Sequence, residues 1–280
     1  SLGAGEPDFD TPDHIKQAAS AALDRGETKY AKPASGVAEL KSAVIDKLAR
    51  ENNLTYAPDQ IIATIGGKEG LYLAFATLLD PGDEVIIPTP YWVSYPEQIK
   101  LVGGLPVFID AGAASGFKIT PEQLRAAITP RTRGFVFNSP SNPTGAAYSP
   151  EETDALAAVL ADTDVITLSD EMYDRLLFGG QEFKSFAATS THAYDHTLTF
   201  NAGSKTFSMT GWRIGYAAGP VDLIKGMSKL QTQTTSGAAT FTMHAMAAAL
   251  NGDQTCVDEM RDAFESRGRF ISEALNRLEG

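Results

Sequence analysis

Residues 204–216 read SKTFSMTGWRIGY, and this segment constrains the architecture more than any other. It places Lys205 directly after an apolar run that ends in Asn-Ala-Gly-Ser, and Arg213 follows eight positions later. A lone lysine is ordinarily a solvated side chain. A nucleophilic lysine must lose its proton near neutral pH, which a nearby cation or loss of solvent favours. The spacing makes Lys205 a candidate nucleophile and Arg213 a candidate phosphate ligand.

Outward from this segment, short apolar runs alternate with patterns of helical periodicity. The runs predict strands over 61–65, 84–87, 105–109, 133–138, 165–168, 197–200 and 214–218. The helical patterns cover 35–50, 68–79, 91–101, 121–128 behind Thr120 as a possible N-cap, 149–161 and 253–278. Such alternation predicts an α/β fold with a mainly parallel sheet.

Several predicted strands end in polar or glycine-containing turns, which are Gly66-Gly67-Lys68, Asn142-Pro143-Thr144-Gly145, Asp170-Glu171 and Ser204-Lys205. Ligands of open α/β sheets bind beyond the carboxyl ends of the strands. We therefore expect an amide, an acid, a lysine and an anion-binding turn to gather at one edge. Taken singly, each motif has a plainer interpretation: the glycines and NPTG as turns, Asp170 as a helix cap. Asp170 could equally hold a cationic heterocycle.

Three segments, SPSNPTG (139–145), SDEMY (169–173) and SKTFSMTGWRIGY, in that order resemble the signature of the class I aminotransferases of fold type I, which use pyridoxal 5'-phosphate (PLP). GEPDFDTP, TKYAKPASG, IGGKEG and PTPYWVSYP are similar to its bacterial aspartate/prephenate branch. The resemblance runs from residue 2 to about residue 250. It implies a three-layer αβα large domain over 1–250, whose first ten or so residues lie near the substrate. Residues 251–280 would form a long helix that leads to a small domain absent from this chain.

The resemblance also implies a role for each residue that matches a family motif. Lys205 would bind PLP covalently and move a proton during the reaction. Asp170 would pair with the pyridine nitrogen, and Trp92 would stack on the ring. Tyr173 and Asn142 would hydrogen-bond the phenolic oxygen of the cofactor.

The phosphate region would be bound by Gly67, Lys68 and Arg213. Tyr30 would reach the phosphate of the cofactor in a neighbouring subunit, which implies a homodimer. Relatives often carry Ser three positions before the lysine, where this chain has Ala202, so one phosphate hydrogen bond would be missing.

The substrate site would include Gly5, whose backbone lies near the substrate carboxylate, together with Trp92 and Asn142. The side chain of Lys68 would be a candidate ligand for the distal carboxylate of a dicarboxylic substrate. Relatives supply an arginine for the α-carboxylate from the small domain, and no arginine near the end of this chain sits in a matching motif. An upstream segment would also be absent.

Transfer of an amino group from an amino acid, aspartate or a similar dicarboxylic one, to a 2-oxo acid such as 2-oxoglutarate is the activity that the resemblance implies. Two alternatives stay open. One is another PLP reaction on the same fold, a C–S lyase or a decarboxylase, because fold does not fix function. The other is a non-catalytic fragment that binds PLP.

Composition excludes other classes. The 280 residues are 43% hydrophobic and carry a net charge of −12 without a Lys/Arg-rich run, which argues against nucleic-acid binding. A single cysteine, Cys256, permits no internal disulfide, and no Cys/His cluster has the spacing of a metal site. Apolar runs are too short to span a membrane. We expect a cytoplasmic protein. Neither Gly-x-Ser-x-Gly nor His-Glu-x-x-His occurs.

Overall fold

The centre of the protein is a seven-stranded sheet, as seen in the computed structural model, which describes residues 5–278. The strand order is β1-β7-β6-β5-β4-β2-β3. β7 is antiparallel to both of its neighbours, and all the other pairs are parallel. The strands are β1 (Ile61–Thr64), β2 (Glu84–Thr89), β3 (Leu105–Asp110), β4 (Thr132–Asn138), β5 (Ile166–Asp170), β6 (Thr197–Ala202) and β7 (Gly215–Ala218). The predicted mainly parallel α/β fold is confirmed.

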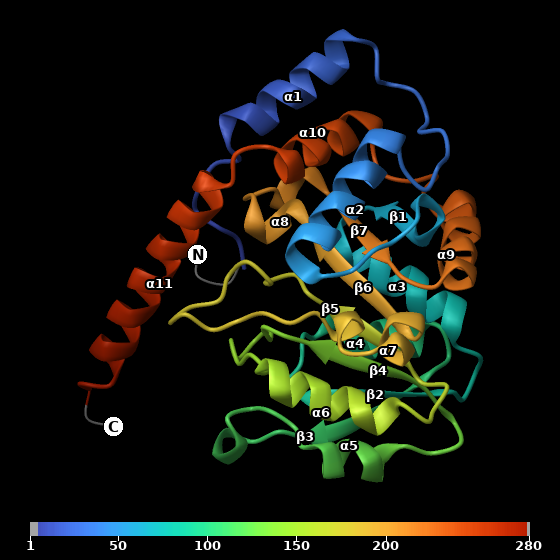
Figure 1. Cartoon of the computed structure of the whole chain (residues 1–280), viewed down its shortest axis with the longest axis vertical. Coiled ribbons are helices and arrows are strands. Elements are labelled where there is room, and N and C mark those ends of the chain that lie inside the picture. The colour runs from blue at the N-terminus through green and yellow to red at the C-terminus, as the bar shows by residue number, and fades with distance from the viewer. Residues whose placement is uncertain (1–4, 279–280) are drawn as a thin grey trace.

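Helices pack on both faces of the sheet and make three layers (Figure 1). One apolar cluster joins the sheet to α3 (Gly66–Leu78), α4 (Ser94–Leu101) and α9 (Val221–Thr234). Two further clusters join it to α1 (Asp13–Asp24), α2 (Ala38–Asn52), α10 (Thr240–Asn251), α5 (Pro121–Ala127), α6 (Pro150–Leu160) and α7 (Thr191–Asp195). A short helix, α8 (Gly203–Thr206), follows β6 directly.

Local sequence explains where these elements begin. β1, β6 and β7 are buried at every residue, which is typical of strands covered by helices on both faces. The side chain of Thr120 accepts the backbone N–H of Gln123, and that of Ser149 accepts the N–H of Glu152. These are the N-caps of α5 and α6, so the predicted cap at Thr120 is confirmed.

Two predicted helix starts are wrong by three residues. The helix expected from residue 35 begins at Ala38, because Gly36 has φ 129°, which no helix accommodates. The helix expected from residue 91 begins at Ser94, and Tyr91 and Trp92 belong to the loop before it.

The carboxyl ends of the parallel strands meet at one edge of the sheet. Because β7 runs in the opposite direction, its first residue, Gly215, lies at the same edge, paired with Thr64 of β1 and Ala202 of β6. The residues just before β7 therefore join those that follow β1 and β6. This reversal brings Arg213 to the edge that carries Lys205.

The last helix, α11 (Thr255–Leu275), runs along one side of the molecule, away from the sheet (Figure 1). Among its residues Val257 and Met260 are buried, whereas Phe270 and Leu275 are exposed. The predicted long helix is confirmed, and the division of the chain after residue 250 stays a prediction. In the part of the chain that the structure describes, no helix is both long and apolar enough to cross a membrane.

Candidate active site

A cavity of about 810 Å³ opens at the carboxyl edge of the sheet. Its lining contains every site residue predicted from the sequence except Tyr30: Gly5, Gly67, Lys68, Trp92, Asn142, Asp170, Tyr173, Lys205 and Arg213. The expected convergence of strand ends is therefore observed, while the roles of the individual residues stay predictions.

Lys205 enters the cavity from α8, one short turn after β6. Its Nζ donates a hydrogen bond to the backbone oxygen of Gly5. Burial lowers the pKa of the Lys205 amine, the charge of Glu6 opposes this shift, and that of Arg213 adds to it. A lysine with a lowered pKa carries more of the neutral amine that attacks a carbonyl carbon.

Asp170 is the last residue of β5 and is almost completely buried. The Tyr95 hydroxyl donates to its Oδ2 at 2.6 Å, and the backbone N–H of Met172 donates to its Oδ1 at 3.3 Å. Burial raises the pKa of Asp170, and these two hydrogen bonds act in the opposite direction. A buried carboxylate with few partners attracts a cation that can enter the cavity.

Beside Asp170, two residues present polar groups to the same space. Asn142 Nδ2 donates to the Tyr173 hydroxyl at 3.4 Å. Burial and the charge of Asp170 raise the pKa of Tyr173, and the hydrogen bond from Asn142 lowers it. Asn138 fixes this group, because it donates to the Asp170 backbone oxygen at 2.9 Å and accepts the N–H of Asn142 at 2.8 Å.

The start of α3 and Arg213 lie together at one end of the cavity. Gly66 has φ +69°, and a Cβ at this position would lie 2.8 Å from Arg213 Nη2, so only glycine allows the guanidinium to approach so closely. Arg213 Nη1 donates to the Thr210 backbone oxygen at 2.8 Å. Free N–H groups at a helix start and a guanidinium both favour phosphate.

Lys68 and Trp92 lie together at the wall of the cavity. The Lys68 Nζ is 4.9 Å from the centroid of the Trp92 ring, within the range of a cation–π contact. Trp92 in turn packs edge-on against Tyr95, with 5.3 Å between ring centroids.

Tyr30 lies elsewhere, in a second hollow of about 710 Å³ that is also lined by Lys29, Lys32 and Phe241. Its side chain is 80% exposed. The role predicted for Tyr30 concerns the site of a neighbouring subunit, so its position outside this cavity does not test that role.

Sequence reasoning missed Tyr95 and Asn138, which both line the cavity. Each of them had a signal in the sequence. Asn138 is the last residue of β4, paired with Asp170 across the ladder, so the strand-end argument applied to it. In the helix predicted over 91–101, Tyr95 follows Trp92 by three positions, which would place both on one face.

These groups fit PLP. The cofactor carries an aldehyde, a phosphate and a pyridine nitrogen, which need an amine, an anion site and a carboxylate. Lys205 would supply the amine, the start of α3 with Arg213 would supply the anion site, and Asp170 would supply the buried carboxylate.

Comparison with known proteins agrees with this geometry. The family model described as aminotransferase class I and II matches residues 1–280. The chain is 52% identical to the aspartate/prephenate aminotransferase of Cereibacter sphaeroides, covering all of this chain and 70% of that protein. It is 50% identical to the aspartate aminotransferase of Geobacillus stearothermophilus, again over the whole chain and 71% of the relative.

Solved structures show the same likeness. The aspartate aminotransferase of Rhizobium meliloti superposes with a TM-score of 0.97 at 48% identity, covering all of this chain and 70% of the other. The enzyme of Thermus thermophilus with maleate gives a TM-score of 0.94 at 46% identity, over 98% of this chain and 71% of that one. With a family match along its entire length and relatives at half identity, this chain belongs to the class I and II aminotransferases.

Proposed function

We propose that this aminotransferase moves the amino group of aspartate, or of a similar dicarboxylic amino acid, to a 2-oxo acid such as 2-oxoglutarate, with PLP as cofactor. One observation carries the proposal: a lysine with a lowered pKa and a buried carboxylate line the same cavity as Arg213 and the glycine-containing start of α3. Three relatives at 48–52% identity are named as aspartate or aspartate/prephenate aminotransferases, which makes the C–S lyase and decarboxylase alternatives less favourable.

PLP, when bound, supplies an electron sink that weakens the bonds at the α-carbon of an amino acid. Lys205 would hold the cofactor covalently and would take the proton from that α-carbon. Asp170 would keep the pyridine nitrogen in its protonated form, because a buried carboxylate is stabilised by a cation beside it. Tyr173 and Asn142 would hold the phenolic oxygen, and Trp92 would stack on the ring.

Gly67, Lys68 and Arg213 would bind the phosphate region of the cofactor. A guanidinium binds two phosphate oxygens at once, which fixes orientation as well as position. Orientation matters because the proton that leaves the α-carbon must face the Lys205 amine.

The preference for a dicarboxylic substrate rests on Lys68 and on the relatives. Lys68 is an exposed cation at the cavity wall, free to meet a second carboxylate of the substrate. The Thermus thermophilus structure is described with maleate, a dicarboxylate. We place the backbone of Gly5, with Trp92 and Asn142, near the α-carboxylate end of the substrate.

We also propose a homodimer in which Tyr30 reaches the cofactor of the other subunit. Support comes from the 80% exposure of this tyrosine, which leaves its side chain accessible to a neighbouring subunit. A cytoplasmic location stays a prediction.

The test is an assay of glutamate formed from aspartate and 2-oxoglutarate in the presence of PLP. Glutamate should form in equal amounts with oxaloacetate, and Lys205→Ala should abolish the reaction because no other amine would be in place to move the proton. Lys229→Ala, which removes an exposed lysine of α9, is the matched control and should keep full activity.

Two results would contradict the proposal. One is consumption of aspartate without glutamate, which would indicate a lyase or decarboxylase. The other is equal activity of the wild type and Lys205→Ala. PLP binding with no turnover would favour the non-catalytic alternative.

A further inference from the structure

The turn that follows β5 presents two sets of side chains to opposite sides. Asp170 and Tyr173 line the cavity. Glu171 and Asp174, each one residue further along, are buried on the other side and do not line it. A spacing of three residues keeps each pair on one side of the turn. The contacts made by Glu171 and Asp174 therefore help to set the orientation of Asp170 and Tyr173 in the cavity.

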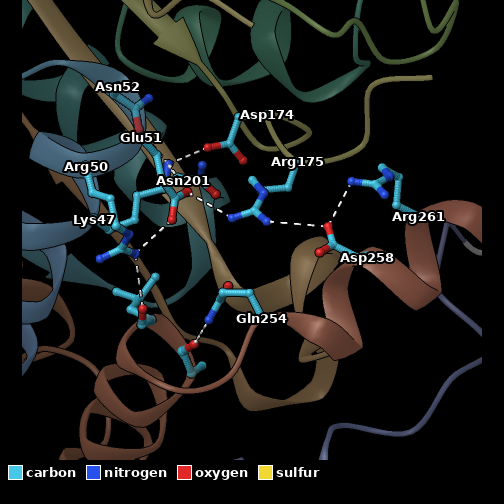
Figure 2. Close-up of polar contacts among 12 residues, drawn as sticks. Lys47, Arg50, Glu51, Asn52, Asp174, Arg175, Asn201, Gln254, Asp258 and Arg261 are labelled. Carbon is cyan, nitrogen blue, oxygen red and sulfur yellow. Dashed lines mark hydrogen bonds and ion pairs between the residues drawn. The ribbon is translucent and has the colours of Figure 1, made fainter. Parts of the chain in front are cut away.

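Lys47 of α2 lies behind the turn, close to Asp174 (Figure 2). This lysine is 5% exposed. Its Nζ pairs with Asp174 Oδ2, donates to Asn52 Oδ1 at 2.8 Å and lies 3.8 Å from Glu51 Oε2. Asn52 connects Lys47 to the second carboxylate, because its Nδ2 donates to Glu171 Oε2 at 3.0 Å. One buried ammonium thus binds both rear carboxylates, directly or through one amide.

Glu171 has its own set of donors. Its Oε1 accepts the hydroxyls of Ser169 at 2.9 Å and Ser185 at 2.6 Å. Burial raises the pKa of Glu171 to about 7, while the hydrogen bond from Ser185 and the charge of Lys47 act to lower it. Burial alone lowers the pKa of Lys47, but the charges of Asp174 and other neighbours reverse the direction and raise it.

The next residue extends the contacts to the last helix (Figure 2). Arg175 Nη1 lies 3.2 Å from Glu51 Oε2, and its Nη2 lies 3.8 Å from Asp258 of α11, which also accepts Arg261 at 2.8 Å. The turn is therefore tied to α2 through Glu171 and Asp174, and to α11 through Arg175.

A buried ion pair of this kind is poor evidence for a stabilising role, since removing two charges from water costs about as much as their attraction returns. Apolar side chains of the same volume would pack behind the turn with less cost. An ion pair instead fixes the relative orientation of its two side chains, because charged hydrogen bonds depend on geometry.

We propose that Lys47 is a positioning residue of the active site. Through Asp174 and Glu171, it fixes the turn that aims Asp170 and Tyr173 into the cavity. This inference rests on the proposed function, since it assigns those two side chains to the cofactor. Lys47 itself touches neither cofactor nor substrate.

The experiment compares Lys47→Met with Lys41→Met in the full chain. Lys41 is a matched control, because it is also buried on α2 but bonds to Ser35 and to the Pro58 backbone oxygen, away from the turn. Three quantities are measured for each variant: the melting temperature without cofactor, the PLP dissociation constant, and the pH midpoint of the visible absorbance of bound PLP.

We expect Lys47→Met to weaken PLP binding about tenfold or more. It should also move the pH midpoint of the absorbance, because a changed orientation of Asp170 and Tyr173 alters the pKa of the bound cofactor. Lys41→Met should lower the melting temperature and leave the affinity and the midpoint unchanged. If Lys47→Met does not fold, Asp174→Asn, which keeps the volume, should give the same changes to a smaller degree.

A charge-balanced double variant, Lys47→Met with Asp174→Asn, separates positioning from stability. It should recover part of the melting temperature lost by Lys47→Met, because no buried charge of this pair is left alone, while the affinity and midpoint stay altered. Recovery of all three together would overturn the inference, as would a Lys47→Met variant that binds PLP like the wild type. A wild type that does not bind PLP would instead refute the proposed function.

Discussion

Removal of the Tyr95 hydroxyl tests how the buried carboxylate of Asp170 is kept charged. In the structure this hydroxyl donates to Asp170 Oδ2 at 2.6 Å, and both side chains are buried. The hydrogen bond opposes the rise in the pKa of Asp170 that burial causes. In Tyr95→Phe that pKa should therefore rise further, so that a larger fraction of Asp170 is protonated and cannot pair with a cation.

The size of the effect follows from the hydrogen bond itself. A hydrogen bond to a charged group contributes about 1.5–3 kcal/mol. If that stabilisation is needed for the cofactor-binding form of Asp170, PLP affinity falls about 10- to 150-fold. The loss should grow as the pH is lowered, because protonation of Asp170 then competes more strongly.

Fluorescence titration with PLP over a range of pH measures this effect. Tyr91→Phe is the control, since the Tyr91 ring stacks on Phe108 with 5.1 Å between centroids and does not line the cavity. It should bind PLP as the wild type does. An affinity of Tyr95→Phe equal to that of the wild type at every pH would refute the reasoning.

Three further predictions concern the glycine turn, a helix cap and the lysine. Gly66→Ala should weaken PLP binding, because the new Cβ displaces Arg213. Gly82→Ala is the control: this glycine also has positive φ but has open space around it, so its substitution should only lower stability. PLP titration measures the first effect, and melting curves measure the second. Ser149→Ala should lose about 1 kcal/mol of unfolding free energy in urea, with PLP affinity unchanged. Lys205→Met should raise the melting temperature of the cofactor-free chain at neutral pH, because burial penalises the ammonium and lowers its pKa. That gain should vanish as the pH rises past the usual lysine value of 10.5, where the folded and unfolded chains both hold a neutral amine.

The strand-end argument predicted the location of those cavity residues that directly end or follow an apolar strand. Asp170 and Lys205 follow continuous apolar runs, and their location at one edge needs only a parallel sheet. Arg213 is different, because its position depends on the antiparallel direction of β7, which no local pattern reveals. For Trp92 the resemblance, rather than any periodicity, indicated a place in the cavity.

The residues that sequence reasoning missed act through distant partners. Tyr95 is 75 residues from Asp170, and Lys47 is 127 residues from Asp174. Lys47 has the sequence context of an ordinary amphipathic helix, in which a lysine is expected in solvent. Its burial arises only when the turn after β5 packs on α2. Pairings of this kind follow from the assembled fold and could not be read from either segment alone.

Reduction of the PLP-loaded protein with borohydride, followed by peptide mapping, tests the central claim most directly. The reagent makes the link between cofactor and lysine permanent, so mass spectrometry identifies the residue that holds PLP. The account predicts that the cofactor mass is found on the peptide that contains Lys205. A label on Lys68, or spread over exposed lysines with Lys205 unmodified, would contradict it.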